Sequence, residues 1–156
     1  MPPDSGPEPV SEVVRQRFRR QRTRDTTPEI AVRKELHRRG LRYRVNASPP
    51  GQRRRADVLF TRAKVAVFVD GCFWHRCPEH GTAPKHNGAW WKAKLDRNVE
   101  RDRKVDAELG REGWAVLRFW EHESPVQAAD AIEREVRSRA APAARRAAQA
   151  ANDPSY

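Results

Sequence analysis

The chain has 156 residues, of which 37% are hydrophobic and 34% are charged, and this length suits one domain with short tails. No apolar run approaches the roughly 20 residues that a membrane-spanning helix needs, which argues against such a helix. The chain carries 32 Lys and Arg against 21 Asp and Glu, a formal net charge of +11. Polyanions are therefore the expected partners, although an arginine-rich composition alone would give the same excess.

The N-terminal part is predicted to be a disordered segment followed by a basic segment. Residues 1–12 are rich in Pro and acidic side chains, and we expect them to be disordered. Residues 13–24 form a basic arm or a short helix, which is either a solvated charged face or a grip for DNA phosphates. Its arginines are Arg15, Arg17, Arg19, Arg20, Arg22 and Arg24.

The first helix is predicted to begin at the motif Thr26-Thr27-Pro28-Glu29, with Thr26 as the cap and Glu29 completing a capping box. Gly40 is expected to end it. Residues 41–45 alternate like a half-buried strand, and a loop follows. The segments 56–60 and 65–69 are predicted to form a hairpin of central strands.

The second half is predicted to contain a long helix over residues 90–112, a strand over 114–120 and a closing helix over 125–139. Gly113 ends the long helix, and Trp114, Phe119 and Trp120 are assigned to the core. Residues 140–156, rich in Ala and Arg, are expected to be a frayed or disordered tail. This order of elements predicts a small α/β domain with a mixed sheet.

A loop after the strand at 65–69 carries metal-binding side chains. Cys72 and Cys77 are the only cysteines, and His80 follows three residues after Cys77. A structural zinc needs four N or S ligands, and His122 is the remote candidate for the fourth. The alternative is two buried free cysteines. A disulfide is less favoured, because we expect a cytosolic protein without a signal peptide.

Several polar side chains stand at positions that favour an apolar residue. Asp57 lies inside an apolar strand, where a carboxylate is costly to bury unless it is paired or binds a metal. Asn98 and Asp102 are four residues apart on one helix face. Glu29 is as well explained by capping as by catalysis. Carboxylate oxygens suit Mg²⁺, and His75 is either a ligand or a general base.

Separated motifs together resemble the very short patch repair (Vsr) DNA mismatch endonucleases. They are Asp70-Gly71-Cys72-Phe73-Trp74-His75, Asn98-Val99-Glu100-Arg101-Asp102, Gly113-Trp114 and Trp120-Glu121, together with Thr26-Thr27-Pro28-Glu29 and Ala56-Asp57. The resemblance runs from about residue 20 to residue 123 and implies a restriction-endonuclease-like fold of the PD-(D/E)xK type, a three-layer α/β domain over residues 13–139. It also implies a Mg²⁺-dependent nick on the 5′ side of the thymine in a T·G mismatch, which arises when 5-methylcytosine is deaminated.

The resemblance also implies a role for each matching residue. Asp57 would bridge two Mg²⁺ ions, and Val69 would offer a main-chain carbonyl. His75 would be the catalytic histidine with Asp102 near it, while Glu29 and Asn98 would order metal-bound water. Phe73, Trp74 and Trp91 would wedge into the base stack beside the mismatch. The alternative for Trp91 is that it packs the long helix on the sheet, and Trp90 is then its alternate. The zinc ligands would be Cys72, Cys77, His80 and His122, the last in place of a family cysteine.

The chain departs from the family at two further positions: Ala56 replaces a Pro before the catalytic Asp, and Asp70 replaces a His. By resemblance we expect a nucleoid-associated cytoplasmic monomer linked to MutL and a repair polymerase. Two alternatives stay open. One is a nuclease of the same fold with another DNA target, and the other is a non-catalytic zinc-stapled DNA-binding module.

Overall fold

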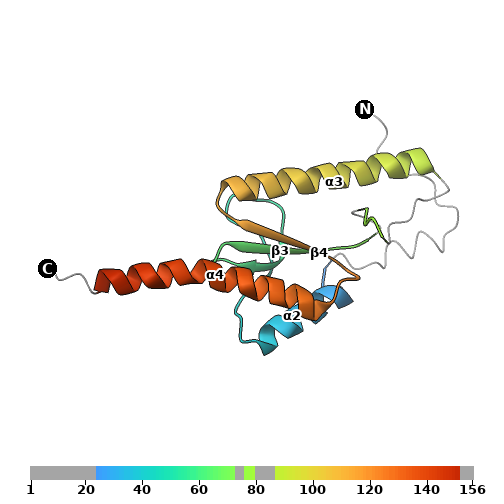
Figure 1. Ribbon diagram of the computed structural model, residues 1–156. Coiled ribbons are helices and arrows are strands. Elements are labelled where there is room, and N and C mark those ends of the chain that lie inside the picture. The colour runs from blue at the N-terminus through green and yellow to red at the C-terminus, as the bar shows by residue number, and fades with distance from the viewer. Residues whose placement is uncertain (1–23, 73–75, 80–86, 152–156) are drawn as a thin grey trace.

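The computed structural model describes residues 24–72, 76–79 and 87–151, where four strands form one mixed sheet with helices on both faces (Figure 1). The strands are β1 (Arg44–Ala47), β2 (Ala56–Phe60), β3 (Val65–Asp70) and β4 (Ala115–Trp120), and they lie in that spatial order. The pairs β1–β2 and β2–β3 are antiparallel, and β3–β4 is parallel. The predicted fold class, a small α/β domain with a mixed sheet, is confirmed.

The helices are α2 (Thr27–Arg38), α3 (Gly88–Arg111) and α4 (Pro125–Ala151). In Figure 1, α3 crosses one face of the sheet, while α2 and α4 lie together on the opposite face. Helix α3 connects β3 to β4 and so provides the crossover that two adjacent parallel strands require. The prediction of a long helix over 90–112 is confirmed within two residues at each end.

Strand β3 is buried on both faces and divides the core into two clusters. Val65 and Val67 pack with α2 and α4, in a cluster that includes Leu36 and Ile132. Ala66 and Phe68 pack with Leu109 of α3 and with Trp114. Such two-sided burial explains why the segment is an almost unbroken apolar run, and both predicted central strands are confirmed.

The assignment of three aromatic residues to the core is confirmed only in part. Trp114 is buried, and Phe119 packs against the cluster beneath α2 and α4. Trp120 is half-buried and lines a cavity beside α3.

The strand predicted at 41–45 begins later than expected, because the end of α2 occupies the preceding residues. Gly40 has φ +76° and its N–H donates to His37 O at 2.9 Å, while the Leu41 N–H donates to Leu36 O at 3.1 Å. This pair of hydrogen bonds is a Schellman motif, which satisfies the last carbonyls of the helix. The strand therefore starts at Arg44, and Leu41 and Tyr43 pack against the core.

Helix α4 continues to Ala151, so the predicted helix end at Arg139 is wrong. The alanine-rich composition taken as a sign of fraying is also the composition with the highest helix propensity. Within the described ranges, none of the helices combines the length and the apolar character that crossing a bilayer requires.

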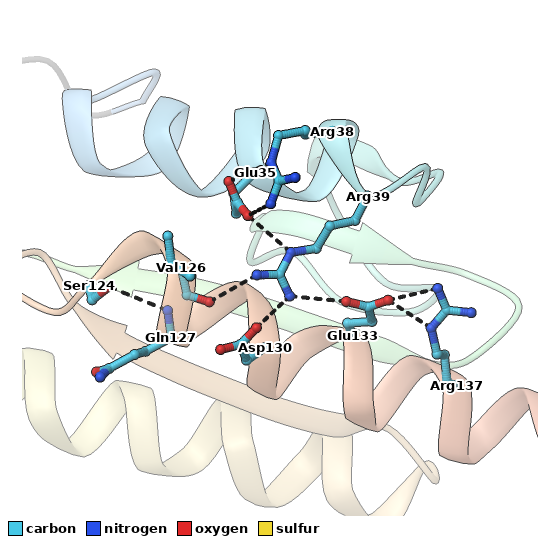
Figure 2. Close-up of polar contacts among 9 residues, drawn as sticks. All are labelled: Glu35, Arg38, Arg39, Ser124, Val126, Gln127, Asp130, Glu133 and Arg137. Atoms are coloured by element: carbon cyan, nitrogen blue, oxygen red, sulfur yellow. Dashed lines mark hydrogen bonds and ion pairs between the residues drawn. The ribbon is translucent and has the colours of Figure 1, made fainter.

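Arg39 joins α2 to α4 through four acceptors (Figure 2). Its Nε donates to Glu35 at 3.1 Å, and its Nη1 donates to Asp130 at 2.6 Å and to Glu133 at 3.0 Å. Its Nη2 donates to the carbonyl of Val126 at 3.4 Å. A planar guanidinium can satisfy several acceptors at once, so this one side chain fixes how the two helices sit on the sheet.

Candidate active site and metal centre

Asp57, the second residue of β2, lies where β2 and β3 separate. The register of these strands runs from Phe60 opposite Val65 to Val58 opposite Val67. Farther along, the Val69 N–H donates to Asp57 Oδ2 at 2.6 Å, so a side chain takes the place of a main-chain acceptor. The fork between the strands therefore holds a half-buried carboxylate in a fixed orientation.

The surroundings of Asp57 make its charged form costly. Burial raises the pKa of its carboxyl group to about 7, although the hydrogen bond from the Val69 N–H lowers this pKa. Repulsion from Glu29 and Asp70 raises this pKa further, and Arg54 lowers it. Without a bound cation the group is therefore part-protonated near neutral pH, and a divalent ion would favour the carboxylate.

Glu29 lies in the first turn of α2 and is only 5% exposed. Its Oε2 accepts the N–H of Asp25 at 2.8 Å, which satisfies a backbone donor at the start of the helix. Thr26 is the N-cap residue but makes no side-chain cap hydrogen bond, so the predicted capping box is wrong in detail. Glu29 caps through Asp25 because Asp25 adopts a left-handed conformation, with φ 53°.

The face of α3 that meets the sheet carries Asp102, which is 8% exposed. Its Oδ1 lies 3.4 Å from Arg54 Nη2 and 3.8 Å from Arg118 Nη2. Leu95 and Leu109 are buried on the same helix, and Asn98 is half-buried. The charges of Arg54 and Arg118 therefore compensate that of the buried Asp102.

Trp91 lies at the beginning of α3 and is half-buried. Its ring meets that of Trp90 edge to face, with the centroids 4.9 Å apart, and Lys94 Nζ lies 4.9 Å from the centre of the Trp90 ring. These two rings form an aromatic pair at the N-terminal end of α3. Base wedging by Trp91 stays a prediction.

Cys72, Cys77 and His122 form a group that could hold a metal ion, because their ligand atoms all lie within 4.8 Å of one another. The Cys77 N–H donates to Cys72 O at 2.9 Å, and Arg76 takes up the left-handed conformation that closes this turn. Both thiols are buried. Arg76 also pairs with Asp96 at 2.7 Å, which ties the loop to α3.

The distances in this group match those of a zinc site. Zn–S bonds of about 2.3 Å and Zn–N bonds of about 2.0 Å at tetrahedral angles place S and N roughly 3.5 Å apart. Cys72 Sγ lies 3.2 Å and Cys77 Sγ 3.7 Å from His122 Nδ1. His122 Nε2 lies 3.4 Å from Glu79, the carboxylate contact that typically orients a metal-binding imidazole.

Burial and the neighbouring Cys77 raise the pKa of the Cys72 thiol. A metal ion reverses this effect, because it binds the thiolate directly.

Comparison with known proteins identifies the family. Residues 12–79 match the family model described as DNA mismatch endonuclease Vsr. The type II nicking enzyme V.NaeI of Lentzea aerocolonigenes is 49% identical over 110 residues, which are 69% of this chain and 66% of that protein. The type II nicking enzyme V.NmeDIP of Neisseria meningitidis serogroup C is 42% identical over 104 residues, 65% of this chain and 69% of that protein.

The DNA mismatch endonuclease Vsr of Escherichia coli K12 is 38% identical over 103 residues, which are 64% of this chain and 63% of that protein. The chain belongs to the Vsr family of DNA nicking endonucleases. It spans about two thirds of the length of these relatives.

The Vsr family model covers Glu29, Asp57, Val69 and both cysteines, whereas Asn98, Asp102 and His122 follow its end at residue 79. The structure brings several of these residues to neighbouring places: Asp57 bonds Val69, Glu29 acts on the pKa of Asp57, and His122 meets both cysteines. Other predicted site residues lie outside the described residues: Phe73, Trp74, His75, His80, Arg19, Arg20 and Arg22. Arg24 lies at the edge of the described chain and is exposed.

Two arginines that lie beside Asp102 are not among the predicted site residues. Arg54 and Arg118 both approach Asp102, and Arg118 also pairs with Asp70. The signal for Arg118 was available, because it is a charged residue inside the apolar strand at 114–120. Arg54 belongs to a run of three arginines just before Asp57, which suggested contacts with DNA phosphates but gave no sign of Asp102.

Proposed function

We propose that this Vsr-family chain nicks one strand of duplex DNA on the 5′ side of the thymine in a T·G mismatch, and that the reaction requires Mg²⁺. The observation that carries this proposal is the half-buried Asp57 carboxylate, held at the fork of β2 and β3 with other carboxylates near it. Apart from metal binding, the fold gains little from an acidic group at this position.

The residues at the fork fit Mg²⁺, which binds one or two carboxylates and keeps several waters. The Val69 side chain is a hydrocarbon that packs against the core. Only the main-chain carbonyl of this residue can therefore bind the ion. Bound Mg²⁺ would polarise the phosphate and supply a nucleophilic water. We assign Asp57 and Val69 as its ligands.

The remaining catalytic assignments follow the family motifs. His75 would move a proton near neutral pH, and Asp102 would hold it in position. Glu29 and Asn98 would order water around the ion. Phe73, Trp74 and Trp91 would open the base stack, which costs less at a mismatch than at a matched pair.

We further propose that the metal in the cysteine loop is zinc, with Cys72, Cys77 and His122 as ligands and His80 as the fourth. Its role would be structural, since it joins the end of β3 to the residues after β4. The proposed unit is a restriction-endonuclease-like domain over residues 13–139. Arg19, Arg20, Arg22 and Arg24 would grip DNA phosphates, and MutL and a repair polymerase are the proposed partners of a monomer.

A second candidate is a nicking enzyme with a different DNA target. It is favoured by one observation: relatives at 49% and 42% identity are named type II nicking enzymes, whereas the one named as a mismatch endonuclease is 38% identical. The same catalytic residues would serve either target, because target choice depends on the loops and on DNA deformability.

The test uses labelled duplexes that carry a T·G mismatch or the matched C·G pair in several flanking sequences, with and without Mg²⁺. We expect a Mg²⁺-dependent nick beside the mismatched thymine, and Asp57→Ala should lower its rate by at least ~10³-fold. Glu100→Ala, an exposed change on α3, is the matched control and should keep the activity.

Equal nicking of matched and mismatched duplexes would favour the second candidate. No nicking by the wild-type protein in any duplex, with DNA binding retained, would favour a non-catalytic binding module.

A further inference from the structure

Arg118 lies in the middle of β4 and gathers three carboxylates from two elements. Its Nε and Nη2 donate to Asp106 of α3, at distances of 2.7 to 3.0 Å. Its Nη1 lies 3.1 Å from each oxygen of Asp70, at the end of β3. Its Nη2 lies 3.8 Å from Asp102 Oδ1, and its guanidinium carbon is 4.3 Å from the centre of the Phe68 ring.

This arrangement is costly unless every charge is compensated. The side chains of Arg118, Asp70 and Asp102 are 19%, 10% and 11% exposed. Burial alone lowers the pKa of Arg118, but Asp106, Asp70 and Asp102 together raise it above its ordinary value. A buried ion pair is worth keeping when both partners are satisfied, and removing one partner leaves an uncompensated charge.

Asp70 has two possible uses at this place. It is near enough to Asp57 to raise the pKa of that group, so a metal ion at the fork could recruit it as a further ligand. However, both of its oxygens already face the same nitrogen of Arg118. The register places Asp70 opposite Trp120, two residues beyond Arg118 on β4, so the contact runs along the face that α3 covers.

We propose that Asp70 is bound to Arg118 and is not a ligand of the catalytic metal, and that Arg118 is the positioning residue that holds Asp70 and Asp102 on the α3 side of the cleavage site. This inference rests on the proposed function for the meaning of the cleavage site. Arg118 fixes the distance between β3 and α3 at the level of Asp102. The planar fork of an arginine offers five N–H donors in a fixed geometry to acceptors on both elements, whereas a lysine offers a single ammonium on a flexible stem.

The first experiment measures metal binding and needs no catalysis. Binding of Mn²⁺ to the folded protein is followed by electron paramagnetic resonance in the wild type, Asp70→Asn and Asp57→Asn. We expect Asp57→Asn to weaken binding by at least ~10-fold and Asp70→Asn to change it by less than ~2-fold. A loss in Asp70→Asn as large as that in Asp57→Asn would make Asp70 a ligand and overturn the proposal.

The second experiment uses the cavity of about 210 Å³ beside Arg118, which Asp70, Asp102 and Asp106 line. Arg118→Ala enlarges this cavity enough to admit a guanidinium ion. We expect kcat for nicking to fall by ~10- to 100-fold with KM for DNA unchanged, and millimolar guanidinium to restore much of it. Urea and NaCl at equal concentration are the solvent controls.

Arg111→Ala, an exposed arginine at the end of α3, is the control variant and should show neither the loss nor the rescue. If Arg118→Ala does not fold, Asp70→Asn/Arg118→Met replaces it, since this double change removes both members of the pair. Its kcat should be no lower than that of Arg118→Met alone, because Asp70 acts only through Arg118.

A loss of kcat that guanidinium does not restore would overturn the positioning role, as would a double variant whose losses multiply. These outcomes differ from failure of the proposed function. That failure is a wild-type protein that nicks no duplex and whose Mn²⁺ binding is unchanged in Asp57→Asn.

Discussion

At the scale of single residues, Asp57 is an ionisable group that the fold buries at a cost in stability. Its carboxyl group lies near two other acids, and one hydrogen bond from the backbone fixes it. A protein that gained nothing from this carboxylate would be more stable with a neutral side chain here. This balance predicts a measurable dependence of stability on pH.

We expect Asp57→Asn to stabilise the metal-free protein as pH rises. The pKa of Asp57 is raised to about 7 by burial, so the folded state keeps a proton that the unfolded chain has lost. Wild-type stability therefore falls as pH increases from about 4 to about 7, and the loss is complete above that range. Asparagine can still accept the Val69 N–H but carries no charge, so the variant avoids this loss.

Thermal unfolding of both proteins from about pH 5 to about pH 8 checks the prediction. At about pH 8 we expect the unfolding temperature of Asp57→Asn to exceed that of the wild type by several degrees, and this difference is the gap between the two proteins. Millimolar Mg²⁺ should raise the unfolding temperature of the wild type only. A gap that does not change with pH would contradict the pKa assigned to Asp57.

At the scale of elements, two connections hold parts that are distant in sequence. Cys72 and Cys77, after β3, meet His122, the second residue after β4. Arg39, just past the end of α2, meets α4 (Figure 2). Both connections join chain segments that the sheet alone would leave free to move.

Replacing a cysteine should remove the metal and loosen the loop. Native mass spectrometry of the wild type should show one bound zinc ion, and Cys72→Ala should show none, with an unfolding temperature lower by at least several degrees. Chelation should have the same effect on the wild type. His37→Ala, an exposed histidine on α2, should keep its zinc.

Replacing Arg39 should weaken the contact between α2 and α4. Arg39→Met keeps the apolar stem but leaves Glu35, Asp130 and Glu133 without their shared cation, so we expect the unfolding temperature to fall by several degrees. Arg38→Met is the matched control. Arg38 also pairs with Glu35 but is 70% exposed, and its loss should have little effect. Equal shifts in the two variants would contradict a special role for Arg39.

At the scale of the whole molecule, the formal charge of +11 is the property most relevant to a DNA partner. The described part of the chain uses many arginines in ion pairs with its own acids, as Arg39 and Arg118 do. The excess that remains is available for phosphates. Binding should therefore depend steeply on salt.

If about six phosphates are neutralised, affinity for duplex DNA should fall by roughly 10³-fold between about 50 and about 200 mM salt. Fluorescence anisotropy with matched duplex DNA measures this slope without cleavage, and Asp57→Asn should give the same slope as the wild type. An affinity that hardly changes with salt would show that the excess charge does not bind phosphates.

The sequence was sufficient to predict an element or a candidate site residue where a local pattern is compatible with only one structure. The hairpin of β2 and β3 followed from two short apolar runs around a turn, and the end of α3 followed from Gly113, which stands just past the helix with φ 85°. The cysteine pair with its remote histidine also followed, because soft ligands are few in this chain. Asp57 was singled out because a charge in a central strand needs a reason.

Only the tertiary structure decided which charged side chains form ion pairs with one another. The pairing of Arg118 with acids on β3 and α3 depends on the parallel register of β3 and β4 and on the placement of α3 across them. The same holds for Arg39, whose partners lie about 90 residues farther along the chain. A linear pattern can show that a residue is unusual for its element, but Coulomb interactions depend on distances in space, which are fixed only when the elements pack.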